Sequence, residues 1–482
     1  MSKLENLKPQ KVFYFFEKIC SIPHGSRNTK AISDYLVSFA KEHNLEYYQD
    51  DSNNVVMIQE ATKGYEDAEP VIIQGHMDMV CEKESGVEID FEKDGLDLYV
   101  EDGFLKARGT TLGGDDGIAV AYALAILDSP EIAHPRLEVV ITVDEEIGML
   151  GAEVIDLSML KGHKLLNIDS DVEGSFLTSC AGGMTAKAEI PVTYQKQEGC
   201  LFHLKLTGLV GGHSGSEIDK ERANAVVLAG RVLKYISDRM NVGLVSLAGG
   251  LKDNAIPREV QMDVLVREDD KKAFEDTIAT ITTILQKEYS VTDAGLVLEC
   301  SDAGNQEVEM LSFTSMSKVI FYLRNMPNGI QHMSMAMPGL VETSLNAGIM
   351  ELKGDVFTVT HSIRSSVSTR KEELKEKLEY LVSFLGGELE VSGDYPAWEY
   401  RAKSSMRDLI SEVYQDLYHK EPVFEAIHAG LECGILSGKI ADLDCVSFGP
   451  TNLDIHTPQE RLDIASTERV WNLVVEFLKR AK

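Results

Sequence analysis

The chain has 482 residues, of which 44% are hydrophobic and 26% are charged, a composition typical of soluble globular proteins. It is longer than one simple hydrophobic core usually supports, so we expect two or three domains. Its formal net charge of −31 argues against binding to nucleic acids or to anionic membranes, because both partners are polyanions.

The N-terminal residues and the cysteines predict a cytoplasmic protein without a membrane partner. Residues 1–20 alternate charged and apolar residues as an amphipathic helix does, and they lack the pattern of a secretory signal. No apolar stretch approaches the ~20 residues that span a bilayer. The seven cysteines are scattered and form no CxxC pair, which is typical of reduced thiols.

The first predicted elements describe an α/β domain. Residues 10–46 have helical periodicity around the loop SIPHGSRNT, in which Ser26 and Asn28 are candidate helix caps. Residues 47–180 then alternate short apolar strands with helices, including a helix over 117–127. This alternation predicts a sheet with helices on both faces.

The pattern changes near residue 187. From there to 397, strands with period-two alternation are separated by helices, which predicts an inserted α+β domain with antiparallel strands. The segment 398–482 returns to a helix–strand–helix order and is expected to complete the first sheet. The predicted fold is therefore an α/β domain with a mixed sheet, formed by residues 1–186 and 398–482, plus the insertion 187–397.

Several apolar runs lead into metal-binding side chains. Strands buried on both faces read as continuous Val/Ile/Leu runs, and in open α/β sheets ligands collect beyond the carboxyl ends of such strands. The runs VIIQGHMD, LEVVITVDEE, KLLNIDSD and DCVSFGPTNLDIH carry His76 and Asp78; Asp144, Glu145 and Glu146; Asp169 and Asp171; and His456. A further segment, TLGGDDG, places Asp115 and Asp116 just before the predicted helix.

Each of these motifs also has an ordinary structural explanation. His76 near Asp78 fits a buried histidine held by a carboxylate, Asp115 could cap a helix, and His456 could be a surface residue. The acidic run 144–146 is also typical of a solvated turn. Their coincidence at strand ends favours one shared site. Carboxylates with two imidazoles and no cysteine suit Zn²⁺, Mn²⁺ or Co²⁺ in a catalytic centre.

The motifs GHMDMV, GGDDGIA, DEEIG, NIDSD and GGHSG resemble those of the co-catalytic zinc metallopeptidase family that includes carboxypeptidase G, peptidase T and the aminoacyl-histidine (Xaa-His, carnosine-cleaving) dipeptidases. The likeness to the last group extends over essentially the whole chain, since GGHSGSEIDKERANA, KDNAIPRE, HAGLECG and SFGPTNLDIHTP follow in the expected order.

The resemblance implies two divalent metal ions per chain, with zinc expected and cobalt or manganese as alternatives. It assigns His76, Asp115 and Asp169 to one ion, and Asp115, Glu146 and His456 to the other. Asp78 would orient His76, and Glu145 would be the general base for attack by a hydroxide that bridges the metals.

In the insertion, the resemblance implies residues that contact substrate. His213 of GGHSG would stabilise the oxyanion, while Asn254 and Arg364 would bind the substrate's terminal carboxylate. Glu432 and His428 of HAGLECG would line the cleft. A glycine-rich turn and an exposed strand arginine are the ordinary readings of His213 and Arg364. The insertion would act as a lid and as the contact of a homodimer, with His213 serving its own or the partner's cleft.

The predicted activity is metal-dependent hydrolysis of unblocked dipeptides, including Xaa-His. A tripeptide aminopeptidase or an N-acyl amino acid deacylase would use the same metal site. A non-catalytic binding protein of the same fold is the third alternative.

Overall fold

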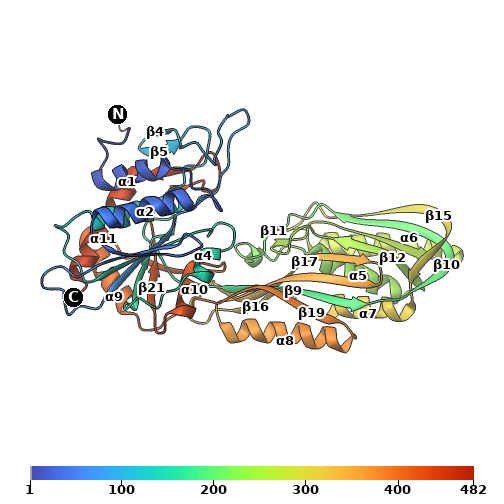
Figure 1. The fold of residues 1–482 in the computed structure, drawn as a ribbon. Helices are drawn as coiled ribbons and strands as arrows, with labels where there is room; N and C mark the ends of the chain where they lie inside the picture. Colours follow the sequence, from blue (N-terminus) through green and yellow to red (C-terminus); the bar gives the residue numbers. More distant parts are fainter. Residues whose placement is uncertain (1–2) are drawn as a thin grey trace. The chain divides into compact units, whose positions relative to one another are not determined.

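A computed structural model describes residues 3–482 and divides the chain into two compact units (Figure 1). The first unit contains the residues up to Ser179 together with Tyr400–Ala426 and Leu431–Lys482, and the second contains Cys180–Glu399 and Ile427–Gly430. The expected boundaries near 186 and 397 thus differ from the observed ones by a few residues, and the segment Ile427–Gly430, expected in the first domain, belongs to the second unit. The first difference arises because β9 (Gly182–Pro191) pairs within the sheet of the second unit.

The first unit is built on an eight-stranded mixed sheet in the order β1-β2-β6-β3-β7-β21-β8-β20. The central strands β6, β3, β7 and β21 are parallel to their neighbours in this group, whereas β1, β2 and β8 pair antiparallel. The strands are β1 (Glu46–Gln49), β2 (Val55–Gln59), β3 (Val71–His76), β6 (Leu137–Thr142), β7 (Lys164–Asn167), β8 (Ser175–Cys180), β20 (Val423–Ile427) and β21 (Asp444–Ser447). Every residue of β3 and β6 is buried, as the continuous apolar runs predict.

Helices cover both faces of this sheet. On one face, α3 packs so closely on β3 that a Cβ atom added to Gly75 would collide with Asp116 and Ala119 of α3. The neighbouring residue Gln74 points to the opposite face, where it donates to Glu432 of α10. The helices of the unit are α1 (Gln10–Cys20), α2 (Lys30–Glu42), α3 (Gly114–Leu127), α4 (Leu150–Val154), α9 (Ser405–Tyr418), α10 (Glu432–Lys439) and α11 (Ile464–Arg480).

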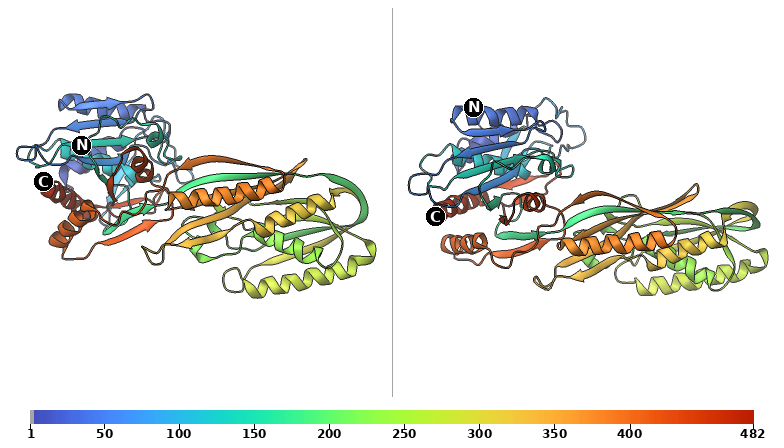
Figure 2. Two further views of the ribbon diagram at one scale, coloured as in Figure 1. Left: turned by 90° about the horizontal axis from the view of Figure 1, so that it is seen from below. Right: turned by 60° about the horizontal axis from the view of Figure 1, so that its bottom comes forward.

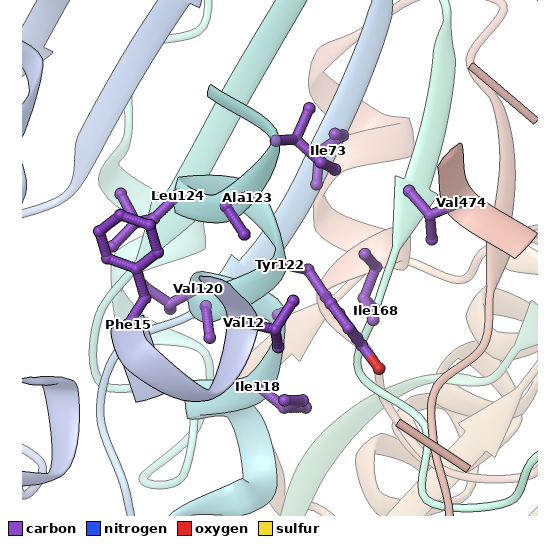
Figure 3. Close-up of a cluster of buried hydrophobic side chains, with 14 of the residues drawn as sticks. Val12, Phe15, Ile73, Ile118, Val120, Tyr122, Ala123, Leu124, Ile168 and Val474 are labelled. Carbon is purple, nitrogen blue, oxygen red and sulfur yellow. The ribbon is translucent and has the colours of Figure 1, made fainter. Parts of the chain in front are cut away.

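The core of the first unit surrounds α3, which is apolar and buried on all sides. Figure 3 shows Val120 and Leu124 of this helix beside Phe15 of α1, and Tyr122 on another side of the helix. The hydroxyl of Tyr122 donates to the carbonyl of Thr467 at 2.8 Å, so this buried polar atom is satisfied. A four-stranded sheet, β22-β23-β5-β4, completes the unit. Its strands are β4 (Leu98–Glu101), β5 (Phe104–Ala107), β22 (Asn452–Leu453) and β23 (Arg461–Asp463).

The second unit contains a nine-stranded antiparallel sheet with helices packed on one side (Figure 2). The order along the sheet is β15-β10-β14-β12-β17-β18-β9-β19, and β16 pairs with β17. Besides β9, the strands are β10 (Tyr194–Thr207), β12 (Val242–Gly249), β14 (Val260–Val266), β15 (Val297–Leu311), β16 (Gly329–Met333), β17 (Val341–Lys353), β18 (Val356–Ser365) and β19 (Glu388–Tyr395). The helices are α5 (Ala225–Ser237), α6 (Lys271–Glu288), α7 (Phe313–Asn325) and α8 (Ser368–Phe384).

Membrane-spanning helices and cysteine pairing were the two other expectations from the sequence. In the part of the chain that the structure describes, no helix is long and apolar enough to cross a membrane. The free thiols include Cys433 and Cys445, whose sulfur atoms lie 3.3 Å apart.

Candidate metal centre

The predicted ligands lie where the parallel strands of the first unit end. β3 ends at His76, β6 leads into Glu145 and Glu146, and β7 leads into Asp169. Because β3 pairs in parallel with both β6 and β7, these carboxyl ends meet at one edge of the sheet. The regular part of α3 begins only after Asp116, since Asp115 and Asp116 have non-helical backbone angles.

Asp115 connects the two histidines. Its Oδ1 lies 3.1 Å from Nε2 of His76, and its Oδ2 lies 3.1 Å from Nε2 of His456. His76 Nε2 is also 3.7 Å from Oδ1 of Asp169, and His456 Nε2 is 3.0 Å from Oε2 of Glu146. The structure therefore brings together all five predicted ligands, in two groups that share Asp115.

These separations fit metal ligation. Two ligands bound tetrahedrally at about 2.1 Å from one zinc ion are about 3.4 Å apart, close to the distances around Asp115. Oε1 of Glu146 is buried without a hydrogen-bond partner, as expected of a carboxylate arranged for a cation. His76, Asp116 and Asp169 also form a possible ligand set, so Asp116, to which the sequence motifs assign no role, is a further candidate.

The electrostatics of the cluster favour a bound cation. Burial raises the pKa of Glu145, of Glu146 and of Asp169, and neighbouring carboxylates raise these pKa values further. Hydrogen bonds to Asp115 and Glu146 raise the pKa of His456 to about 10. Crowded, desolvated carboxylates repel one another, and a divalent ion removes that repulsion.

Nδ1 of His76, the ring nitrogen that faces away from Asp115, is held by Asp78. Nδ1 donates to the carbonyl of Asp78 at 3.0 Å, and Oδ1 of the same residue lies 3.4 Å away. The Asp78 carboxylate in turn accepts from the hydroxyl of Ser26 at 2.8 Å and from the backbone N–H of Glu145 at 3.1 Å. The sequence suggested Ser26 as a helix cap, but α2 begins after Thr29. The side chain of Ser26 instead donates to Asp78, so the loop that contains it supports the site.

Glu460 supports Asp115, and no motif in the sequence points to it. This buried carboxylate accepts the backbone N–H groups of Leu112 at 2.7 Å and of Gly114 at 2.8 Å. The N–H groups of Gly113 and Asp115 approach it at 3.1 and 3.4 Å. The only sequence signal is its position four residues after His456, which does not distinguish it from other acidic residues.

Glu432 differs from the cleft-lining position expected of it. Its side chain has no exposed surface, and its Oε2 accepts hydrogen bonds from Gln74 and from the hydroxyl of Thr142, the latter at 2.7 Å. Gln74 also accepts from the amide of Asn167 at 2.6 Å. Glu432 therefore connects β3 and β6 directly, and it connects to β7 through Gln74. Burial raises the pKa of Glu432 to about 7.

Two of the predicted substrate contacts in the second unit, His213 and Asn254, lie near each other. His213 lies in β11 (Gly212–His213), which pairs with β13 (Ala255–Ile256), and the N–H of Ser214 donates to the carbonyl of Asn254 at 2.9 Å. Arg364 lies in β18 and is buried rather than exposed. Burial, and then the positive charge of Arg364, lower the pKa of His213.

Comparison with known proteins supports this interpretation of the fold. The chain matches the peptidase family M20/M25/M40 over residues 72–480. It is 36% identical over 481 residues to the cytosol non-specific dipeptidase of Escherichia coli (strain K12), and the aligned residues cover 99% of each chain. The crystal structure of aminoacylhistidine dipeptidase from Vibrio alginolyticus has a TM-score of 0.93 and 34% identity, covering 99% of this chain and 98% of that one. The aminopeptidase PepT from Bacillus cereus shares the fold, with a TM-score of 0.57 and 14% identity over 98% of this chain and 99% of its own.

Proposed function

Because the chain belongs to peptidase family M20/M25/M40, we propose that it is a metal-dependent dipeptidase that hydrolyses unblocked dipeptides, including Xaa-His dipeptides. The observation that carries the proposal is the position of Asp115, whose two oxygens each lie 3.1 Å from a different histidine. A carboxylate between two imidazoles, with a further carboxylate beside each, is the donor set of a dinuclear centre. The E. coli and V. alginolyticus relatives, both named dipeptidases, support the substrate class.

His76, Asp115 and Asp169 would hold one divalent ion, and Asp115, Glu146 and His456 the other, with zinc as the proposed metal. The donor set consists of nitrogen and oxygen atoms without a thiolate, which suits a catalytic zinc, cobalt or manganese site. When bound, two such ions supply Lewis-acid activation of water and polarise the scissile carbonyl. His76 would keep its ligand tautomer because Nδ1–H donates to the Asp78 carbonyl.

Glu145 is the proposed general base. Oε2 lies 4.0 Å from Nε2 of His76, so this carboxylate is beside the ligands without pairing closely to either histidine. Its backbone N–H is held by Asp78, which fixes the residue relative to His76. Glu145 would accept the proton of the attacking water and deliver it to the leaving amine.

The second unit would recognise the substrate. The guanidinium of Arg364 donates to the Tyr395 hydroxyl at 3.2 Å, but among residues 3–482 it has no carboxylate within ion-pair distance, although only 9% of the residue is exposed. A buried guanidinium without an anionic partner is costly, so its position supports binding of the C-terminal carboxylate. His213 would donate to the developing oxyanion, with Asn254 beside it.

Substitution of Glu145 by glutamine tests the proposal. The variant keeps the size of the side chain but cannot accept the proton, so hydrolysis of Ala-His and β-Ala-His should fall by about 10²- to 10⁴-fold. Metal analysis of the same protein should still find about two ions per chain. Glu153→Gln, an exposed acidic residue in α4, is the matched control. Turnover at the wild-type rate in Glu145→Gln would refute the assigned role.

A substrate panel separates the alternatives. Wild-type rates on Ala-His, on a tripeptide and on an N-acetylated amino acid distinguish a dipeptidase from a tripeptide aminopeptidase and from a deacylase. Loss of all rates in a chelator control, with recovery on adding zinc, shows metal dependence. A protein that hydrolyses none of them while binding metal would favour the non-catalytic alternative.

The expected homodimer and the cytoplasmic location are further proposals. Light scattering of the purified protein measures the first. The second is supported by the name of the cytosol dipeptidase relative, and cell fractionation tests it.

A further inference from the structure

Four buried side-chain atoms in the second unit have no hydrogen-bond partner among residues 3–482, and two of them, unlike Oγ of Ser214 and Nδ1 of His361, belong to side chains joined through one serine. These two are Nε of Arg364 and Nδ1 of His428. Unsatisfied buried donors or acceptors are rare in native proteins, and each one calls for an explanation such as a ligand. Both residues are mainly buried, with 9% of Arg364 and 7% of His428 exposed.

The two residues are adjacent through Ser344. In the antiparallel pair β17–β18, Ser344 stands opposite Arg364, so both side chains project from the same face of the sheet. The Ser344 hydroxyl lies 2.7 Å from Nε2 of His428. His213 is also close to His428, because a Cβ built on Gly215 would be 2.7 Å from the carbonyl oxygen of His428 and 2.9 Å from the His213 ring.

The imidazole of His428 is neutral and can therefore offer one N–H. Burial, and then the charges of Arg364 and His213, lower the pKa of His428 to about 3. If the Ser344 hydroxyl donates to Nε2, the proton of the ring is on Nδ1, the atom without a partner. Nδ1–H of His428 and Nε–H of Arg364 then both lack an acceptor, although another nitrogen of Arg364 donates to the Tyr395 hydroxyl at 3.2 Å. The positive charge of Arg364 favours an anionic acceptor.

We infer that His428, oriented by Ser344, is a further specificity-determining residue that donates from Nδ1 to the C-terminal carboxylate of the substrate beside Arg364. This inference rests on the proposed dipeptidase function. Arg364 provides the charge, and His428 provides a directed hydrogen bond that is stronger to a carboxylate than to a neutral terminal group.

Two substitutions at His428 separate binding from structure. Asparagine places its amide N–H near the position of Nδ1 and loses the contact with Ser344, whereas glutamine places its amide near Nε2 and loses the Nδ1 donor. His203→Gln, which changes an exposed histidine of the same unit, is the control. The substrates are Ala-His and Ala-His amide, which differ only in the terminal group.

We expect His428→Gln to lower kcat/KM on Ala-His by about tenfold to a hundredfold, mainly through KM, because it removes a hydrogen bond to a charged group. On Ala-His amide the loss should be less than about threefold, since this neutral group makes the weaker bond. His428→Asn should retain part of the preference for the free carboxylate. Equal losses on both substrates, or full preference retained in His428→Gln, would overturn the inference.

Equilibrium binding keeps this test separate from the proposed function. Isothermal titration of both ligands into metal-loaded Glu145→Gln protein, with and without His428→Gln, measures recognition without turnover. If wild-type protein fails to hydrolyse Ala-His, the proposed function is refuted, while the titration still decides the role of His428. Binding of Ala-His that is unaffected by His428→Gln contradicts the inference even if the enzyme is active.

Discussion

Glu460 provides the sharpest test of how the backbone positions the bridging ligand. Its carboxylate makes two short hydrogen bonds, at 2.7 Å to the N–H of Leu112 and 2.8 Å to that of Gly114. A hydrogen bond to a charged group contributes about 1.5–3 kcal/mol, so Glu460→Ala should lower the free energy of unfolding of the first unit by about 3–6 kcal/mol. Glu460→Gln keeps one acceptor oxygen and should lose about half of that amount.

Urea unfolding followed by tryptophan fluorescence measures the effect. The chain has two tryptophans, Trp471 in the first unit and Trp398 in the second, so a Trp398→Phe background reports on the first unit. Gln459→Ala, an exposed neighbour, is the control. Zinc affinity of Glu460→Ala should fall about 10- to 100-fold, because the segment that carries Asp115 loses its anchor. Wild-type stability and zinc affinity in Glu460→Ala would refute this reasoning.

Three further predictions concern the site, the second unit and the metals. Ser26→Ala removes the hydroxyl donor to Asp78, and kcat/KM or zinc affinity should fall about tenfold, with the exposed Ser38→Ala as control; unchanged values would contradict the supporting role. Burial lowers the pKa of His361 to about 3, below its unfolded value of 6.5, so stability is full above pH 6.5 and lost as the pH falls. The share of His361 is about 1.4 kcal/mol per pH unit, and His361→Gln, followed by Trp398 fluorescence in urea, should reduce the slope by that amount; an unchanged slope would contradict it. Zinc at a hundred times its Kd should stabilise chelator-treated protein by about 2.7 kcal/mol, measured as a thermal shift that a metal-independent fold would lack.

The sequence predicts the parts of the site that depend on local pattern. The apolar run at the start of β3 indicates a strand buried on both faces, and the polar residue that ends such a strand lies at the sheet edge. His76 and Asp169 can therefore be assigned to one edge from the residue pattern alone. The change to period-two alternation likewise indicates the inserted antiparallel sheet, although β9 (Gly182–Pro191) already belongs to it.

The supporting residues could not be predicted, because nothing in their local sequence separates them from ordinary polar residues. Ser26 acts through Asp78, and Glu460 acts through backbone N–H groups that are more than 300 positions away in the chain. Their contacts exist only once α3 and the loops are packed. This explains why the two kinds of residue should respond differently to substitution. Loss of a ligand such as His456 changes metal binding directly, whereas loss of Glu460 changes stability and metal binding together. Measuring both quantities on each variant therefore distinguishes a ligand from its support.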